Sequence, residues 1–259
     1  MDFGELWRYR ELFFFMAWRD VLIRYKQTAV GIAWAVIKPL LMMVVFTLIF
    51  GRVAQMPSEG VPYPLLTLTA LLPWQFFSQS VMQSTTSLVA NANMISKIYF
   101  PRLIMPTAIT LAHVVDFLIS IVVLAGIMVW YKFVPTIAVL AFPLFFLLAF
   151  LAALGLSLWL SALNVEYRDV QHAVPFFLQF GLYVSPVGFS STIVPEKWRF
   201  IYSLNPLVGI IDGFRWSILA EKTQFNLNDL LLSFAVTLLL LISGLLYFRK
   251  VERTFADVI

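Results

Sequence analysis

The sequence predicts an all-α integral membrane protein with six transmembrane helices. Of its 259 residues, 61% are hydrophobic and 12% are charged, and the mean hydropathy is +0.88. Soluble domains are about 45–50% apolar and about 25% charged. Each crossing of a bilayer needs about 20 mostly apolar residues, and runs of this kind take up most of residues 1–259, which we treat as a single transmembrane domain. The expected spans are residues 30–50, 65–88, 103–130, 136–163, 171–189 and 230–248.

A basic amphipathic helix is predicted ahead of the first span, over residues 1–28. Its aromatic and apolar side chains recur at helical spacing and form one stripe, which contains Trp7, Phe14, Trp18, Val21 and Tyr25. The basic residues lie off that stripe, as expected for a helix lying flat at the lipid headgroups. The alternative is that these residues simply extend the first span.

Several spans contain residues that are unusual in lipid. Pro39 should kink the first span, and Pro175 and Pro186 should break the fifth. Residues 73–80 of the second span mix aromatic with uncharged polar side chains, which should face protein or water rather than lipid.

Residues 190–227 are difficult to place. Residues 201–219 are apolar enough to touch lipid, but prolines, glycines and charges interrupt them. Broken backbone at membrane depth must be covered by protein or water. We therefore expect two short helices here, re-entrant or interfacial, on the periplasmic side.

The polar segment 91–106 separates two long apolar runs. Asn93 is a suitable N-cap and Pro101 should end a helix, so the segment predicts a two-turn helix over residues 94–100. One face of that helix carries Met94, Ile95, Ile98 and Tyr99. An apolar face outside the membrane suggests docking into a groove on another protein; the alternative is a connector resting on the headgroups.

The distribution of lysine and arginine predicts the orientation. These residues are more frequent on the side that holds both termini, the segment 91–106 and a compact charged loop at 164–170. By the positive-inside rule that side is cytoplasmic.

The residue content also argues against several kinds of site. There is no cysteine, which excludes disulfides, thiolate zinc sites and iron–sulfur clusters, and the two histidines lie far apart in the sequence. No phosphate-binding loop of the Gly-x-x-x-x-Gly-Lys-Ser/Thr type occurs. We expect no enzyme activity, no cofactor held by this chain and no nucleic-acid partner.

Five stretches resemble the membrane subunits of polysaccharide-exporting ABC transporters, the ABC-2 permease family. They occur in the family's order at residues 19–40, 71–78, 100–102, 164–170 and 205–206. The resemblance implies a homodimer in the bacterial inner membrane with both termini cytoplasmic. It also implies two copies of a separate P-loop ATPase subunit, which would hold ATP and magnesium.

The resemblance further implies roles for the extramembrane segments. The N-terminal helix would be the interface helix, residues near 94–100 the cytoplasmic coupling helix, and the loop at 164–170 a second ATPase contact. The short helices after residue 190 would gate the periplasmic side. The residues implied in coupling are Met94, Ile95, Ile98, Tyr99, Arg102, Glu166 and Arg168.

The implied substrate is a glycan on undecaprenyl diphosphate, with an O antigen as the favoured glycan. Its path needs polar groups for hydroxyls and aromatic faces for sugar rings, which the second span offers in Trp74, Gln75, Phe76, Phe77, Gln79 and Gln83. The lipid diphosphate would be attracted by cations at headgroup level, namely Arg24, Lys26 and Lys97. Helix packing and positive-inside topology are the respective alternatives.

Asp116 is the carboxylate well inside a predicted span, where a charge is costly and implies a reason. His113 lies three residues away on the same helical face and is a candidate partner. The pair could be structural, or it could carry protons. The competing functions are therefore an ABC-2 exporter of a drug or lipid and, less favoured, a proton-coupled carrier or a membrane glycosyltransferase.

Overall fold

The computed structural model describes residues 7–26, 32–219, 226–253 and 255, and these residues form helices without any strand. Four of the described helical segments are long and apolar enough to cross a membrane: Ala33–Val53, Ile104–Trp130, Ile137–Glu166 and Leu227–Glu252. The all-helical, multi-pass membrane class is therefore confirmed. Parts of the predicted interface helix (1–6 and 27–28) and the predicted start of the first span lie outside the described residues.

The described elements follow one another in this order: α2 (Arg10–Lys26), α3 (Ile32–Phe46), the π-helix η1 (Thr47–Val53), α4 (Tyr63–Ala90), α5 (Ala92–Ile95), α6 (Ile104–Trp130), the 3-10 helix η2 (Ile137–Ala141), α7 (Phe142–Glu166), α8 (Val170–Val184), η3 (Ser191–Ile193), α9 (Glu196–Ser203), α10 (Pro206–Leu219) and α11 (Leu227–Glu252).

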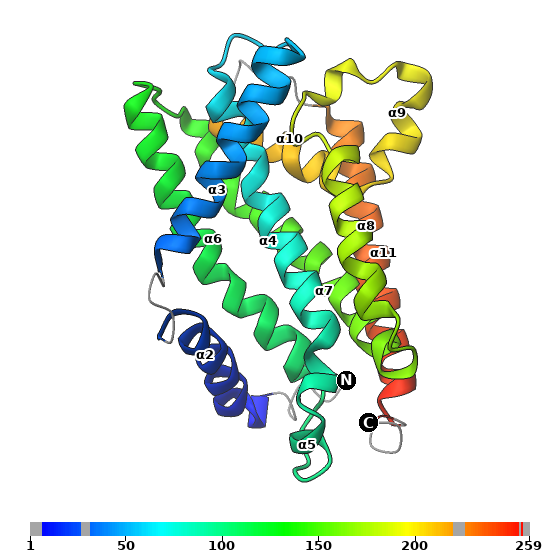
Figure 1. The fold of residues 1–259 in the computed structure, drawn as a ribbon. Helices are drawn as coiled ribbons and strands as arrows, with labels where there is room; N and C mark the ends of the chain where they lie inside the picture. The colour runs from blue at the N-terminus through cyan, green and yellow to red at the C-terminus, as the bar shows by residue number, and fades with distance from the viewer. Residues whose placement is uncertain (1–6, 27–31, 220–225, 254, 256–259) are drawn as a thin grey trace.

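The long helices run roughly along one axis of the molecule (Figure 1). The short helix α5 and the last turns of α11 lie at one end, and α9 and α10 lie at the other. Helix α2 lies beside α6, in the half of the molecule that carries α5.

Helix α4 is the centre of the packing. It contacts α3, α6, α7, α8 and α10, and most of its residues between Leu65 and Leu88 are buried. Some of its polar side chains are satisfied within the helix: the hydroxyls of Thr69 and Thr85 each donate to a carbonyl four residues earlier, at 2.7 Å. A helix surrounded by protein tolerates such residues, because they do not meet lipid.

Small residues let α7 and α11 approach closely. A Cβ added to Gly155 would lie 2.8 Å from the backbone nitrogen of Leu241, and one added to Gly244 would lie 2.5 Å from the carbonyl oxygen of Gly155. The two backbones therefore touch at this point, as small residues allow in membrane helix pairs.

The segment after α4 differs from the prediction. Helix α5 covers only Ala92–Ile95, and Asn91, not Asn93, precedes it without a side-chain cap. Backbone hydrogen bonds extend the turn as far as Ile98. The chain then leaves the helix because Phe100, which is 4% exposed, packs in the apolar cluster beneath.

The charged loop predicted at 164–170 is shorter in the structure. Helix α7 continues through Glu166, and α8 begins at Val170. The side-chain oxygen of Asn164 accepts from the backbone N–H of Gln171 at 3.0 Å, which joins the end of α7 to the first turn of α8. Helix α8 ends at Val184, ahead of Pro186, earlier than the predicted 189.

The two short helices predicted within 190–227 are present as α9 and α10. Helix α10 does not lie on a surface: it packs on α4, α7 and α11, and nearly all its side chains are buried. Buried apolar side chains include Ile210 and Phe214, both 0% exposed. Helix α10 is therefore enclosed by other helices of the chain, whereas α9 is largely exposed.

Candidate functional site

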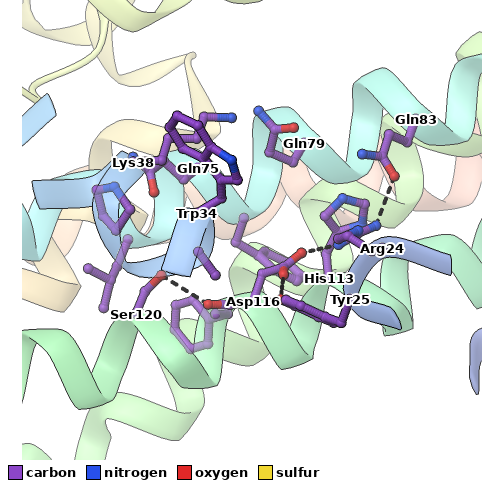
Figure 2. A pocket seen from close by; sticks show the side chains of 15 residues that line it. Arg24, Tyr25, Trp34, Lys38, Gln75, Gln79, Gln83, His113, Asp116 and Ser120 are labelled. Atoms are coloured by element: carbon purple, nitrogen blue, oxygen red, sulfur yellow. Dashed lines mark hydrogen bonds and ion pairs between the residues drawn. The ribbon is translucent and has the colours of Figure 1, made fainter. Parts of the chain in front are cut away.

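A cavity of about 300 Å³ lies between α2, α3, α4 and α6 (Figure 2). It combines charged, amide and aromatic side chains from these four helices. Those used below are Arg24, Tyr25, Lys38, Gln75, Phe76, Gln79, Gln83, His113 and Asp116.

Asp116 on α6 anchors the N-terminal helix. Its carboxylate accepts a hydrogen bond from the hydroxyl of Tyr25 and forms an ion pair with the guanidinium of Arg24. Arg24 also donates to the side-chain oxygen of Gln83 on α4, at 2.9 Å. Burial raises the pKa of the Tyr25 phenol and the hydrogen bond to Asp116 raises it further, so this hydroxyl remains a donor at neutral pH.

The predicted pairing of His113 with Asp116 is wrong. The Nδ1 atom of His113 lies 2.8 Å from the carbonyl oxygen of Ile109. The carboxylate of Asp116 turns toward α2, because Arg24 and Tyr25 supply a cation and a hydroxyl that helix spacing does not reveal. A proton-coupled carrier based on this pair therefore loses its geometric basis.

His113 has an unused ring nitrogen. A backbone carbonyl can only accept, so Nδ1 carries the hydrogen in this contact. In the neutral ring Nε2 is then an acceptor, and it is buried without a partner among the described residues. The whole side chain is 2% exposed and lines the cavity.

The structure divides the six predicted path residues. Gln75, Gln79 and Gln83 follow one another at four-residue intervals along α4 and line the cavity. Phe76 also lines it, while its ring lies 5.2 Å from that of Phe146 on α7.

Trp74 and Phe77 do not line this cavity. Each is 5% exposed and belongs to the main apolar core. Trp74 packs against Gly181 on α8, where a Cβ would lie 2.9 Å from the indole ring.

Lys38 lies within the predicted first span, and its side chain lines the cavity. Its ammonium forms no hydrogen bond or ion pair with any residue that the structure describes. The signal that could have identified it was a cation inside an otherwise apolar run.

The three cations predicted to attract a lipid diphosphate are not brought together. Arg24 lines the cavity, whereas Lys26 is exposed at the end of α2 and does not. Lys97 is exposed in a separate shallow pocket formed by residues 95–102.

The apolar face predicted for the segment 91–106 is only partly exposed. Ile98 is 59% exposed and Tyr99 is 77% exposed, and Met94 is half-buried. Ile95 is 6% exposed and packs in the apolar cluster together with Phe100. Ile95 therefore supports this surface from below and is not part of it.

Arg102 is held within the chain. Its backbone N–H donates to the carboxylate of Glu252 at 3.1 Å, and its guanidinium donates to the carbonyl oxygen of the same residue. The guanidinium also lies 5.9 Å from the ring centre of Phe255. Glu166 and Arg168, the other predicted contact residues, are exposed at the turn between α7 and α8.

A family model described as ABC-2 type transporter matches residues 11–219. The chain belongs to the ABC-2 type transporter family. The matched range contains the cavity and the segment 91–106, so both are features of the family portion of this ABC-2 protein.

Named relatives match this ABC-2 protein over almost its whole length. The O-antigen export system permease protein RfbA of Klebsiella pneumoniae is 29% identical over 242 residues, which is 93% of this chain and 92% of the relative. The protein of the same name from Myxococcus xanthus is 29% identical over 256 residues, 98% and 97% of the two chains. The polysialic acid transport protein KpsM of Escherichia coli is 22% identical over 240 residues, 91% of each.

Proposed function

We propose that this ABC-2 protein is the permease subunit of an ATP-driven exporter that moves a lipid-linked polysaccharide from the cytoplasm to the periplasm. The polysaccharide that we propose is an O antigen. The observation that carries the proposal is the near full-length relationship to two O-antigen export permeases. The glycan is carried on undecaprenyl diphosphate.

The chain crosses the inner membrane six times. Helices α4 and α8 complete the set begun by the four strongly apolar segments. At 1.5 Å per residue, the 28 residues of α4 extend for about 42 Å, which is ample for a bilayer core of about 30 Å. The 15 residues of α8 extend for only about 22 Å, so the irregular chain after Val184 completes that crossing. Both termini are cytoplasmic, together with α5.

Two copies of the permease assemble with two copies of a separate ATPase subunit. The exposed side chains of Ile98 and Tyr99 seat in a groove of the ATPase, with Met94 beside them, and Ile95 supports them from below. Glu166 and Arg168 form a second contact at the turn between α7 and α8. Arg102 holds the segment against the end of α11 and acts in coupling through that position.

The polar side chains of α4 serve the substrate. Gln75, Gln79 and Gln83 offer amide groups to sugar hydroxyls, and Phe76 offers a ring face. Lys26 and Lys97 are exposed and attract the anionic lipid head at the membrane surface.

The test is the location of the polysaccharide in cells that lack this gene. Lipid-linked polysaccharide should accumulate on the cytoplasmic side, out of reach of a lectin added outside, and complementation with the wild-type gene should restore surface labelling. Undiminished surface polysaccharide in the deletion strain, together with loss of resistance to a drug or altered lipid export, would contradict the proposal.

A further inference from the structure

The cavity between α2, α3, α4 and α6 contains more positive than negative charge. Arg24 and Lys38 are cations, Asp116 is the anion, and His113 carries no charge in the neutral ring. Asp116 balances Arg24 through their ion pair. With Lys38 included, the charged side chains that line the cavity carry one positive charge in excess.

The position of Lys38 makes that charge significant. It is the sixth residue of the segment Ala33–Val53, so it lies about 8 Å along the helix from the start of that segment. A cation at that depth is costly unless it is paired or reaches the headgroups. Its stem lines the cavity, so an anion entering there meets the ammonium.

Two further groups in the same cavity have hydrogen-bonding capacity to spare. The side-chain nitrogen of Gln75 is buried without a partner in the described part of the chain, and it is a donor. The Nε2 atom of His113 is likewise buried and unpartnered, and it is an acceptor. Gln75 needs an acceptor and His113 needs a donor: a phosphoryl oxygen can serve the first, and a sugar hydroxyl can serve the second.

We propose that this cavity binds the phosphorylated sugar at the head of a lipid. Lys38 is the counter-ion of the phosphoryl group. The phosphoryl group and the carboxylate of Asp116 compete for the guanidinium of Arg24. This inference rests on the proposed export function and adds the site where the head is held. The amide of Gln75 donates to the phosphoryl oxygens, and His113 accepts from a sugar hydroxyl. The lipid chain remains in the bilayer, which α3 borders with exposed apolar side chains such as Trp34 and Leu41.

The competition gives the site a second property. Arg24 and Tyr25 are the side chains that join α2 to Asp116. A phosphoryl group that draws Arg24 away from Asp116 breaks the ion pair between α2 and α6 and leaves the hydrogen bond from Tyr25. Occupancy of the cavity therefore loosens the attachment of the N-terminal helix to α6.

The experiment measures equilibrium binding to the full chain in phosphatidylcholine nanodiscs. The probe is undecaprenyl diphosphate that carries one N-acetylhexosamine, compared with sugar-free undecaprenyl phosphate, phosphatidylglycerol and inorganic diphosphate. Lys38→Gln should weaken binding of the sugar-bearing probe about tenfold or more, because a hydrogen bond to a charged group is lost. Lys38→Arg should largely restore it.

The opposite sign is expected at the competitor. Asp116→Asn should strengthen binding of the sugar-bearing probe, because Arg24 is then available to the phosphoryl group. A residue that served only to hold the fold would weaken binding when replaced. Lys250→Gln is the matched control, since it removes an exposed cation at the end of α11 and should change nothing.

Other results would overturn the inference. Unchanged binding in Lys38→Gln would mean that Lys38 only reaches toward the headgroups. Weaker binding in Asp116→Asn would mean that the carboxylate holds the cavity together and does not compete with a bound anion. If inorganic diphosphate bound as tightly as the sugar-bearing probe and in a Lys38-dependent way, the site would be one for a soluble phosphate. The same result with phosphatidylglycerol would make it a site for a bulk lipid. Failure of the export function is distinguishable, because surface polysaccharide would then survive deletion of the gene whatever the binding result.

Discussion

The region around α10 and the cavity beside α2 both hold charged side chains among packed helices, but they complete their interactions to different degrees. Arg215 on α10 is 2% exposed and donates to the carbonyl oxygens of Leu66, Val187 and Phe189, at 3.4, 3.1 and 2.8 Å. Asp212, one turn earlier, is 7% exposed and close enough to Arg215 to interact with its charge. Each of the three guanidinium nitrogens therefore donates to a backbone carbonyl of the chain.

The cavity beside α2 differs in this respect. Arg24 and Asp116 form an ion pair whose side chains are 25% and 29% exposed. Beside them, Lys38 forms no hydrogen bond or ion pair with any described residue. The buried Nε2 atoms of Gln75 and His113 have no partner in the described part of the chain either. A completed network holds backbone segments in place, whereas an incomplete one leaves groups available to a ligand. Two isoleucines of the segment 91–106 differ in burial in a comparable way: Ile95 is packed inside the chain, whereas Ile98 is exposed and available to a partner.

The largest loss of stability is expected at Arg215. Arg215→Met should lower the free energy of unfolding by about 3–5 kcal/mol, because it leaves Asp212 buried without its cation and three carbonyls without their donor. Thermal unfolding in detergent would measure the loss. The exposed Lys197→Met on α9 is the control and should stay within about 0.5 kcal/mol. A wild-type melting temperature for Arg215→Met would show that the charges around α10 do not hold the fold together.

A smaller loss is expected at Ile95. Ile95→Ala should cost about 2–5 kcal/mol, since it empties space in the apolar cluster that Phe100 shares. Unfolding titrated with sodium dodecyl sulfate would measure the change. The matched variant Ile98→Ala removes the same atoms from an exposed position and should be close to neutral. Equal losses from the two variants would show that the segment packs differently.

Ile98→Asp should leave stability unchanged but abolish ATPase docking and export. The aspartate would remain solvated in the free permease, yet would be desolvated in an apolar groove, which is costly. Co-purification of the ATPase with the permease is the measurement. Ser96→Asp places the same charge on an exposed neighbouring position and should keep the ATPase. Stoichiometric recovery of the ATPase with Ile98→Asp would remove the docking role.

Only a small stability change is expected at Asp116. Asp116→Asn should cost about 1 kcal/mol or less, because both members of its ion pair are partly exposed and Arg24 keeps its hydrogen bond to Gln83. Thermal unfolding of this variant beside Tyr25→Phe, which removes the other donor, would test it. A loss as large as that of Arg215→Met would mean that the two regions are equally structural.

Much of the fold followed from the sequence, because long apolar runs must become helices in a membrane, where each backbone polar group needs an internal partner. The two short helices after residue 190 followed from the break at 205–206, between α9 and α10, whereas α10 continues through 212–213. The bounds of α5 did not. The helix begins at Ala92 because the backbone N–H groups of Met94 and Ile95 donate to the carbonyl of Asn91, and beyond its end Phe100 is buried in a cluster built from distant helices.

The candidate site was only partly predictable. The four-residue spacing of the glutamines puts them on one face of α4, but spacing could not separate Phe76 from Trp74 and Phe77. Trp74 packs against Gly181 of α8, and both Trp74 and Phe77 belong to the main apolar core. Spacing along α6 suggested His113 as the partner of Asp116, because helix periodicity reports only neighbours on the same helix. The actual partners are 92 and 91 residues away in sequence.

The sequence by itself determined that this chain is a helical membrane protein of the ABC-2 kind, since composition and short motifs are local properties. The tertiary structure alone decided which polar residues are satisfied and which are not. Satisfaction depends on side chains from four helices meeting within about 3 Å. For Arg215, Asp116 and Lys38, the partners supplied by other parts of the chain, and not the residue type, decide whether a charge is structural or available to a ligand.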